Sequence, residues 1–125
     1  MLKIIICLIF SLNAYSKCDM YIERPEFAEN KFFDLNVLDE YSLGTERSVK
    51  NKEVTDFILK TAQKLQFGDN KLNKKIYNHI KQNKTLKLKQ IVNFDNQTRK
   101  AYMLINSFDK EHYYSFILYS DCSID

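Results

Sequence analysis

The stretch TLKLKQIVNFDNQTRKAYMLINSFDKEHYYSFILYS, residues 85–120, determines the fold of this chain. Apolar and polar side chains alternate along it with a period of two, which is typical of strands that bury one face. Residues 95–98 and 108–111 interrupt the alternation with Asp or Asn side chains that favour turns. We therefore expect three consecutive antiparallel strands.

The register of these strands follows if each turn contains two loop residues. Loops at 96–97 and 109–110 would place Gln90 opposite Met103 and Met103 opposite Phe116. Both pairings put the same side chains of the middle strand on one apolar face, and a slip by one residue would break this agreement. The predicted core face comprises Leu86, Leu88, Val92, Phe94, Ala101, Met103, Ile105, Tyr114, Phe116 and Leu118.

The opposite face of the predicted sheet is half polar, with tyrosines among lysines. Tyr102, Tyr113 and Tyr119 are its candidate binding residues, because aromatic side chains are enriched where proteins bind partners. One alternative is that residues 26–43 cover this face. The other is that it is a solvated surface with ordinary strand-forming tyrosines.

Helical patterns precede the strands. Residues 52–67 carry an apolar stripe after a capping Asn51, and residues 71–82 carry a second, narrower stripe. Residues 26–43 fit a strand or a helix, and Pro25 with the apolar spacing favours a helix. The predicted fold class is α+β, with two or three helices packed on one face of an antiparallel β-meander of at least three strands.

Residues 1–16 have the layout of a cleavable signal peptide. Lys3 makes the start positive, residues 4–12 are almost entirely apolar, and small residues precede a cut after Ser16. The apolar run is about half of the roughly twenty residues that a helix needs to cross hydrocarbon. We therefore expect one mature domain of residues 17–125, secreted or periplasmic, with no stable membrane insertion after cleavage.

Cysteine usage agrees with export. Cys7 lies in the predicted leader, so the mature chain keeps Cys18 and Cys122, one near each end. In an oxidising compartment this pair is expected to form a disulfide. The chain has no CxxC pattern, so neither a metal site nor a cofactor is expected.

Charge is segregated along the chain. Acidic side chains outnumber basic ones more than twofold in residues 17–46, whereas basic ones outnumber acidic ones threefold in residues 47–110. The basic part either faces anions or is covered by the acidic part. Of the 19 basic residues only Arg24, Arg47 and Arg99 are arginines, which serves bidentate phosphate recognition poorly. No nucleic-acid partner is expected.

Catalytic signatures are missing from the sequence. His79 and His112 are the only histidines, neither has a second ligand at metal spacing, and no HExxH, GxSxG or P-loop pattern occurs. The chain is therefore predicted not to be an enzyme. Asn83 and Asn96 begin N-x-Thr patterns, which are glycosylation acceptors in a eukaryotic secreted chain and incidental in any other.

The segment KQIV, residues 89–92, resembles the start of the QxVxG motif of the cystatin family of cysteine-protease inhibitors, and residues 115–119 resemble one of its later strands. Phe94 stands where the motif has glycine. The resemblance implies a small secreted fold of a helix followed by antiparallel hairpins, whose tip enters a protease cleft without reacting. The contact residues it implies are Gln90, Val92, Phe94 and Asn96.

The predicted function is that of an exported, non-catalytic domain that binds another protein, with cysteine-protease inhibition implied by the resemblance. A first alternative is a bacterial periplasmic immunity-type protein that neutralises a toxin. A second is a small secreted enzyme or ligand carrier with a pocket between helices and sheet.

Overall fold

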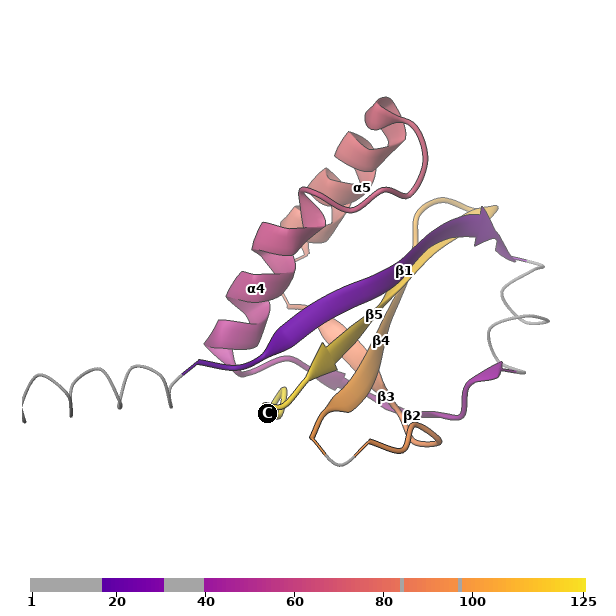
Figure 1. Cartoon of the computed structure of the whole chain (residues 1–125). Helices are drawn as coiled ribbons and strands as arrows, with labels where there is room; N and C mark the ends of the chain where they lie inside the picture. Colours follow the sequence, from indigo (N-terminus) through magenta and orange to yellow (C-terminus); the bar gives the residue numbers. More distant parts are fainter. Residues whose placement is uncertain (1–16, 31–39, 84, 97) are drawn as a thin grey trace, which may run out of the picture.

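The alternating residues at the C-terminal end do form three consecutive strands, and two earlier strands join them in one sheet (Figure 1). A computed structural model describes residues 17–30, 40–83, 85–96 and 98–125; the predicted leader, residues 1–16, lies outside them. The strands form one antiparallel sheet in the order β1-β5-β4-β3-β2. The elements are β1 (Met20–Glu29), β2 (Leu43–Ser48), α4 (Lys52–Ala62), α5 (Asn70–Gln82), β3 (Lys87–Ile91), β4 (Lys100–Ser107) and β5 (His112–Ser120).

The fold is α+β, but the predicted architecture is wrong. The described residues form a five-stranded antiparallel sheet with two short helices, and its first strand pairs with its last, whereas a β-meander with two or three helices packed on one face was predicted. Residues 26–29, expected to begin a helix, continue β1, and residue 43 begins β2; residues 31–39 lie outside the described part. The two strands β1 and β5 lie near opposite ends of the sequence. Local periodicity therefore could not reveal that they pair with each other.

Both predicted hairpin registers are wrong by one residue. Lys89 pairs with Met103, and Met103 pairs with Ile117. The loop between β4 and β5 contains an odd number of residues. Phe108 N–H donates to the His112 carbonyl (2.9 Å), and three residues lie between these two. Since successive side chains of a strand point to opposite faces, an odd loop in place of an even one exchanges the two faces of β4.

Two clusters of buried side chains lie on the two faces of the sheet. The larger one joins one sheet face to apolar side chains of α4 and α5 and to Ile124 near the C-terminus. Its strand members are Leu88, Tyr102, Leu104, Tyr114, Phe116 and Leu118. The smaller cluster lies on the other face and comprises Ile91, Ala101, Met103, Tyr113 and Ile117.

Each helix starts at a side-chain cap that the sequence contains. Asn51 Oδ1 accepts from Glu53 N–H (3.0 Å), and Asp69 Oδ1 accepts from Leu72 N–H (2.8 Å). These bonds satisfy amide donors that the first helical turn leaves free. Helix α4 ends at Ala62, five residues before the predicted end. Among the described residues, neither helix has the length and apolarity needed to span a membrane.

Candidate functional site

The β3–β4 turn presents an exposed apolar side chain on an anchored backbone. Val92 directly follows β3 and is 61% exposed. Its N–H donates to the Ser42 carbonyl (2.8 Å). The adjacent Asn93 side chain accepts from Ser42 N–H (3.1 Å) and donates to the Glu40 carbonyl (3.4 Å). These bonds tie the turn to residues 40–42, so Val92 projects from a backbone that is already ordered before any partner arrives.

An aromatic row, defined as Tyr21, Tyr119 and Phe94, extends from this turn to the outer strand β1. The Phe94 ring lies 5.2 Å from that of Tyr119, which stacks on Tyr21 at 4.7 Å. The Arg99 guanidinium lies over Tyr21 at 5.1 Å and forms an ion pair with Asp19. Tyr21 and Val92 are the exposed large hydrophobic residues of the described chain.

The hairpin residues expected from the sequence occupy different positions. Val92 and Phe94, which were also predicted on the core face of a strand, lie in the turn after β3 instead, where Val92 is exposed. Gln90 is half-buried within β3 opposite Tyr102. The exposed Asn96 accepts hydrogen bonds through Oδ1 from the Thr98 N–H and hydroxyl, both at 2.9 Å. Its side chain therefore shapes its own loop.

The three predicted face tyrosines are not on one surface. Tyr102 is fully buried in the larger cluster, on the face opposite the predicted one. Tyr113 lies in the smaller cluster and is 4% exposed, so only Tyr119, half-buried in the aromatic row, is accessible. The placement of Tyr102 is a direct consequence of the register correction, because one residue of slip moves it across the sheet.

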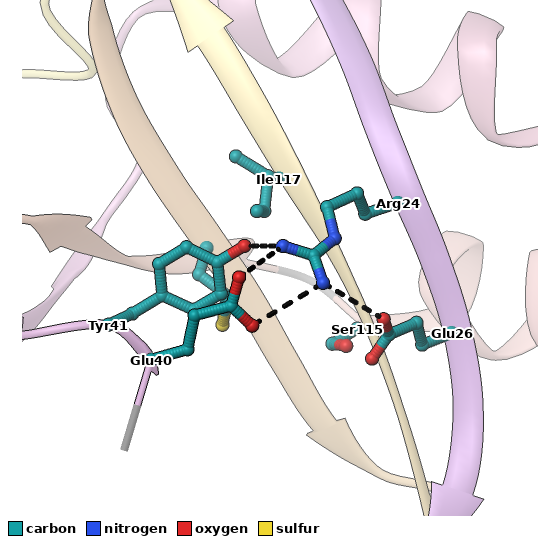
Figure 2. Close-up of a pocket in the computed structure, with 7 residues that line it drawn as sticks. Arg24, Glu26, Glu40, Tyr41, Ser115 and Ile117 are labelled. Atoms are coloured by element: carbon teal, nitrogen blue, oxygen red, sulfur yellow. Dashed lines mark hydrogen bonds and ion pairs between the residues drawn. The ribbon is translucent and has the colours of Figure 1, made fainter. Parts of the chain in front are cut away.

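A pocket that the sequence analysis missed lies over the smaller cluster (Figure 2). Arg24 forms one wall from a β-bulge in β1, where its φ of 56° is positive. Positive φ is strained for a residue that is not glycine. The pocket is further lined by Glu26, Glu40, Tyr41, Met103, Ser115 and Ile117.

The charges of this pocket already satisfy one another. Arg24 Nη1 donates to Glu40 Oε1 (2.9 Å) and to the Tyr41 hydroxyl, and Nη2 lies 3.8 Å from Glu26 Oε1. The arginine thus connects β1 to residues 40–41 across the sheet. No sequence pattern indicated the positive φ of Arg24 or its contacts with residues 40–41, since a residue before proline is ordinarily extended.

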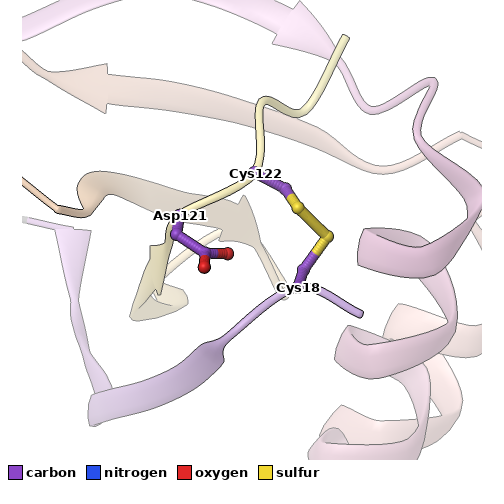
Figure 3. A group of neighbouring side chains, drawn as sticks. All are labelled: Cys18, Asp121 and Cys122. Atoms are coloured by element: carbon purple, nitrogen blue, oxygen red, sulfur yellow. A yellow bond between two sulfur atoms is a disulfide. The ribbon is translucent and has the colours of Figure 1, made fainter. Parts of the chain in front are cut away.

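The predicted disulfide between Cys18 and Cys122 is confirmed, with a Cα–Cα distance of 5.6 Å (Figure 3). Asp121 lies beside it and accepts from Asp19 N–H (2.8 Å) through Oδ1. Within the described residues, these two cysteines and Asp121 are the one group with metal-ligand spacing. Because the two sulfur atoms are bonded to each other, neither is a thiolate that could bind a metal ion.

The two histidines have separate hydrogen-bond partners. His79 Nδ1 on α5 lies 2.6 Å from the hydroxyl of Tyr114 on β5, and Asn106 Nδ2 donates to that hydroxyl (3.1 Å). His112 Nδ1 lies 3.0 Å from Asp109 Oδ1 in the β4–β5 turn. His79 therefore connects helix to sheet, which the sequence did not suggest for a residue among lysines.

Stability is expected to fall between pH 10 and pH 12 because of Tyr114. Burial raises its pKa from 10 to about 12, although the hydrogen bond from Asn106 opposes the rise. The folded state favours the neutral phenol, so this contribution is complete below pH 10 and is lost as the pH passes 12. Two pKa units correspond to about 2–3 kcal/mol.

The test is urea unfolding of the wild type and of Tyr114→Phe at several pH values. The variant lacks the hydroxyl bonded to His79 and Asn106 and is expected to be less stable at pH 8 by about 1–3 kcal/mol. The gap should shrink above pH 10. A gap that stays constant up to pH 12 would contradict the assignment.

Comparisons of the chain with protein-family models, with curated proteins and with solved structures found no match.

Proposed function

We propose that this chain is an exported, non-catalytic domain that binds another protein through the β3–β4 turn and the aromatic row. The observation that carries the proposal is the 61% exposure of Val92 on a turn held by backbone and Asn93 hydrogen bonds. An ordered turn loses little conformational freedom on binding, so more of the contact energy remains as affinity. The Cys18–Cys122 disulfide and the leader-like residues 1–16 support export.

The proposed interface combines a projecting side chain with an aromatic flank. Full burial of Val92 by a partner would contribute about 1.5–3 kcal/mol. Tyr21, 38% exposed, adds a ring and a hydroxyl at the far end of the row, and such residues are enriched at binding hot spots. Arg99 and Asp19 border this end with a charged pair.

The more specific form of the proposal is inhibition of a papain-type cysteine protease. In this form the turn that follows Gln90 enters the active-site cleft and blocks it without reacting, with Val92 making the deepest contact. The support is the QIV sequence at residues 90–92 and the projection of Val92 from the end of β3. A periplasmic toxin is the alternative partner, and the identity of the captured protein separates the two.

The experiment uses disulfide-bonded residues 17–125 as bait against the extracellular or envelope fraction of the source cells, with mass spectrometry of what is retained. Val92→Asp places a charge in the proposed contact and should weaken capture at least tenfold. Ser107→Asp is the matched control, because the substitution adds the same charge at an exposed position at the far end of β4.

Parallel assays measure papain activity with micromolar protein. Inhibition by wild type and by Ser107→Asp, but not by Val92→Asp, would support the inhibitor form. Full papain activity would remove that form and leave the broader proposal to the capture experiment. A partner captured equally by all three proteins, or no partner at all, would overturn the broader proposal.

A further inference from the structure

The outer face of α5 carries a row of positive charges that form no salt bridge with the described residues. We define the lysine face as the four exposed lysines of this helix, Lys71, Lys74, Lys75 and Lys81. Their spacing places them on the side of the helix opposite Ile76 and Ile80, which are both fully buried. Within α5 there is no acidic side chain to neutralise them.

The acidic N-terminal segment does not neutralise the lysine face in the part of the chain that the structure describes. There the salt bridges are made by the three arginines and His112, and none includes a lysine. Lys71 also lies three and four residues before Lys74 and Lys75, and like charges at these spacings destabilise a helix by a few tenths of a kcal/mol each. An anion bound here would relieve this repulsion.

A wide, open pocket lies next to the lysine face, between the end of α4 and the first turns of α5. Its volume is about 1100 Å³, including the solvent at its mouth. Two lysines of the lysine face form part of its wall, together with four amide side chains and one aromatic ring. The lining residues are Gln63, Gln66, Asn70, Lys71, Asn73, Lys74 and Tyr77.

Hydrogen bonds of Asn73 hold the wall of this pocket in shape. Asn73 Oδ1 accepts from Phe67 N–H (2.7 Å) and Gly68 N–H (2.9 Å), and its Nδ2 donates to Gln66 Oε1 (2.9 Å). Gln63 Nε2 in turn donates to the Tyr77 hydroxyl (2.9 Å). The α4–α5 connection is therefore ordered by side chains that line the pocket.

Several polar groups of the pocket keep hydrogen-bonding capacity for a ligand. Gln63 retains its carbonyl oxygen and Gln66 its amide nitrogen after the bonds above, and both residues are exposed. Asn70 is also exposed and contributes both its side-chain carbonyl oxygen and its amide nitrogen to the pocket. Amides both donate and accept, which matches the hydroxyl groups of a sugar. The Tyr77 ring lines the pocket with apolar surface, and the Lys81 ammonium lies over it, 6.0 Å from the ring centroid. A sugar ring that packs its C–H face on Tyr77 would therefore have this lysine beside it.

We propose that this surface binds an anionic polysaccharide, with one acidic sugar in the pocket and its neighbours along the lysine face. Each lysine ammonium is a point charge that can bind a carboxylate or a sulfate group, whereas the arginine guanidinium favours bidentate binding in a fixed geometry. The surface is separate from the β3–β4 turn, so the inference stands or falls independently of the proposed protein partner.

Two other anionic partners fit the surface less well. A helix that binds a lipid surface turns its apolar side to the membrane, but Ile76 and Ile80 face the core, and the exposed large hydrophobics of the described chain, Tyr21 and Val92, lie elsewhere. Single-stranded nucleic acid is bound by successive aromatic platforms, whereas Tyr77 is the one ring in this pocket.

The experiment measures binding of disulfide-bonded residues 17–125 to four probes by isothermal titration and co-sedimentation. The probes are heparin, which is sulfated; polygalacturonate, which is carboxylated; vesicles of phosphatidylglycerol and phosphatidylcholine; and a single-stranded DNA oligonucleotide. Lys71→Ala with Lys74→Ala removes two charges at the pocket. The matched control is Lys87→Ala with Lys110→Ala, which removes two exposed charges outside the helices. Tyr77→Leu keeps apolar bulk but removes the ring.

The expected result is binding to one or both polysaccharides that is weakened at least tenfold by the Lys71/Lys74 variant and at least threefold by Tyr77→Leu, with the control close to wild type. Which polysaccharide binds identifies sulfate or carboxylate as the preferred group. Equal losses in both lysine variants would indicate unspecific charge attraction and overturn the proposal. So would vesicle or DNA binding at least as tight as polysaccharide binding, or no binding to either polysaccharide. Melting temperatures establish that each variant is folded.

Discussion

Replacement of both Cys18 and Cys122 by serine is expected to lower the free energy of unfolding by about 2–5 kcal/mol. The bond joins residues separated by 104 positions, and closing a loop of that length restricts the unfolded chain by about 4–5 kcal/mol on the chain-entropy account. Cys18 lies just before β1 and Cys122 just after β5, so the bond also closes the pair of strands that is most distant in sequence.

Urea unfolding of the double variant, beside wild type with and without a reductant, measures the effect. The reduced wild type should match the double variant, because both lack the same covalent constraint. Hydrogen exchange should accelerate first in β1, which pairs with only one neighbouring strand. Equal unfolding free energies for the oxidised and reduced proteins would contradict the prediction, and free thiols in native material would contradict export.

Leu104→Ala is expected to cost about 2–5 kcal/mol, because it removes a fully buried side chain from the larger cluster. Ile105→Ala, at the neighbouring position, removes a half-buried side chain that packs on the smaller cluster, and it should cost less than half as much. The two variants delete side chains of the same size from opposite faces of β4. Their difference therefore reports which face of the strand is in the main core.

This comparison also separates the two possible registers. The register predicted from two-residue loops places Ile105 in the core and Leu104 on the open face, whereas the observed pairing with β3 and β5 does the reverse. Chemical unfolding of both variants gives the two free energies directly. A larger loss for Ile105→Ala than for Leu104→Ala would mean that the observed register is wrong.

The candidate interaction surface was predictable only in part. The turn after β3 follows from the change of pattern near Asp95 and Asn96, so Val92 and Phe94 could be placed near it from the sequence. The stack of Tyr21 on Tyr119 could not, because it requires β1 to pair with a strand almost a hundred residues away. The lysines of α5 were evident as an exposed face, but the pocket beside them depends on the Asn73 hydrogen bonds that fold the α4–α5 connection.

The sequence by itself determined the features that depend on neighbouring residues: the start of the first helix at Asn51, the position of the second helix and the three C-terminal strands. It also indicated the disulfide, because the predicted mature chain has only two cysteines. Tertiary structure alone decided which face of β4 is buried, since one loop residue more or less reverses every side chain of the strand without changing the local pattern. It also decided that the N-terminal segment is a strand, because the hydrogen-bonding partner that favours this conformation is β5, at the other end of the chain.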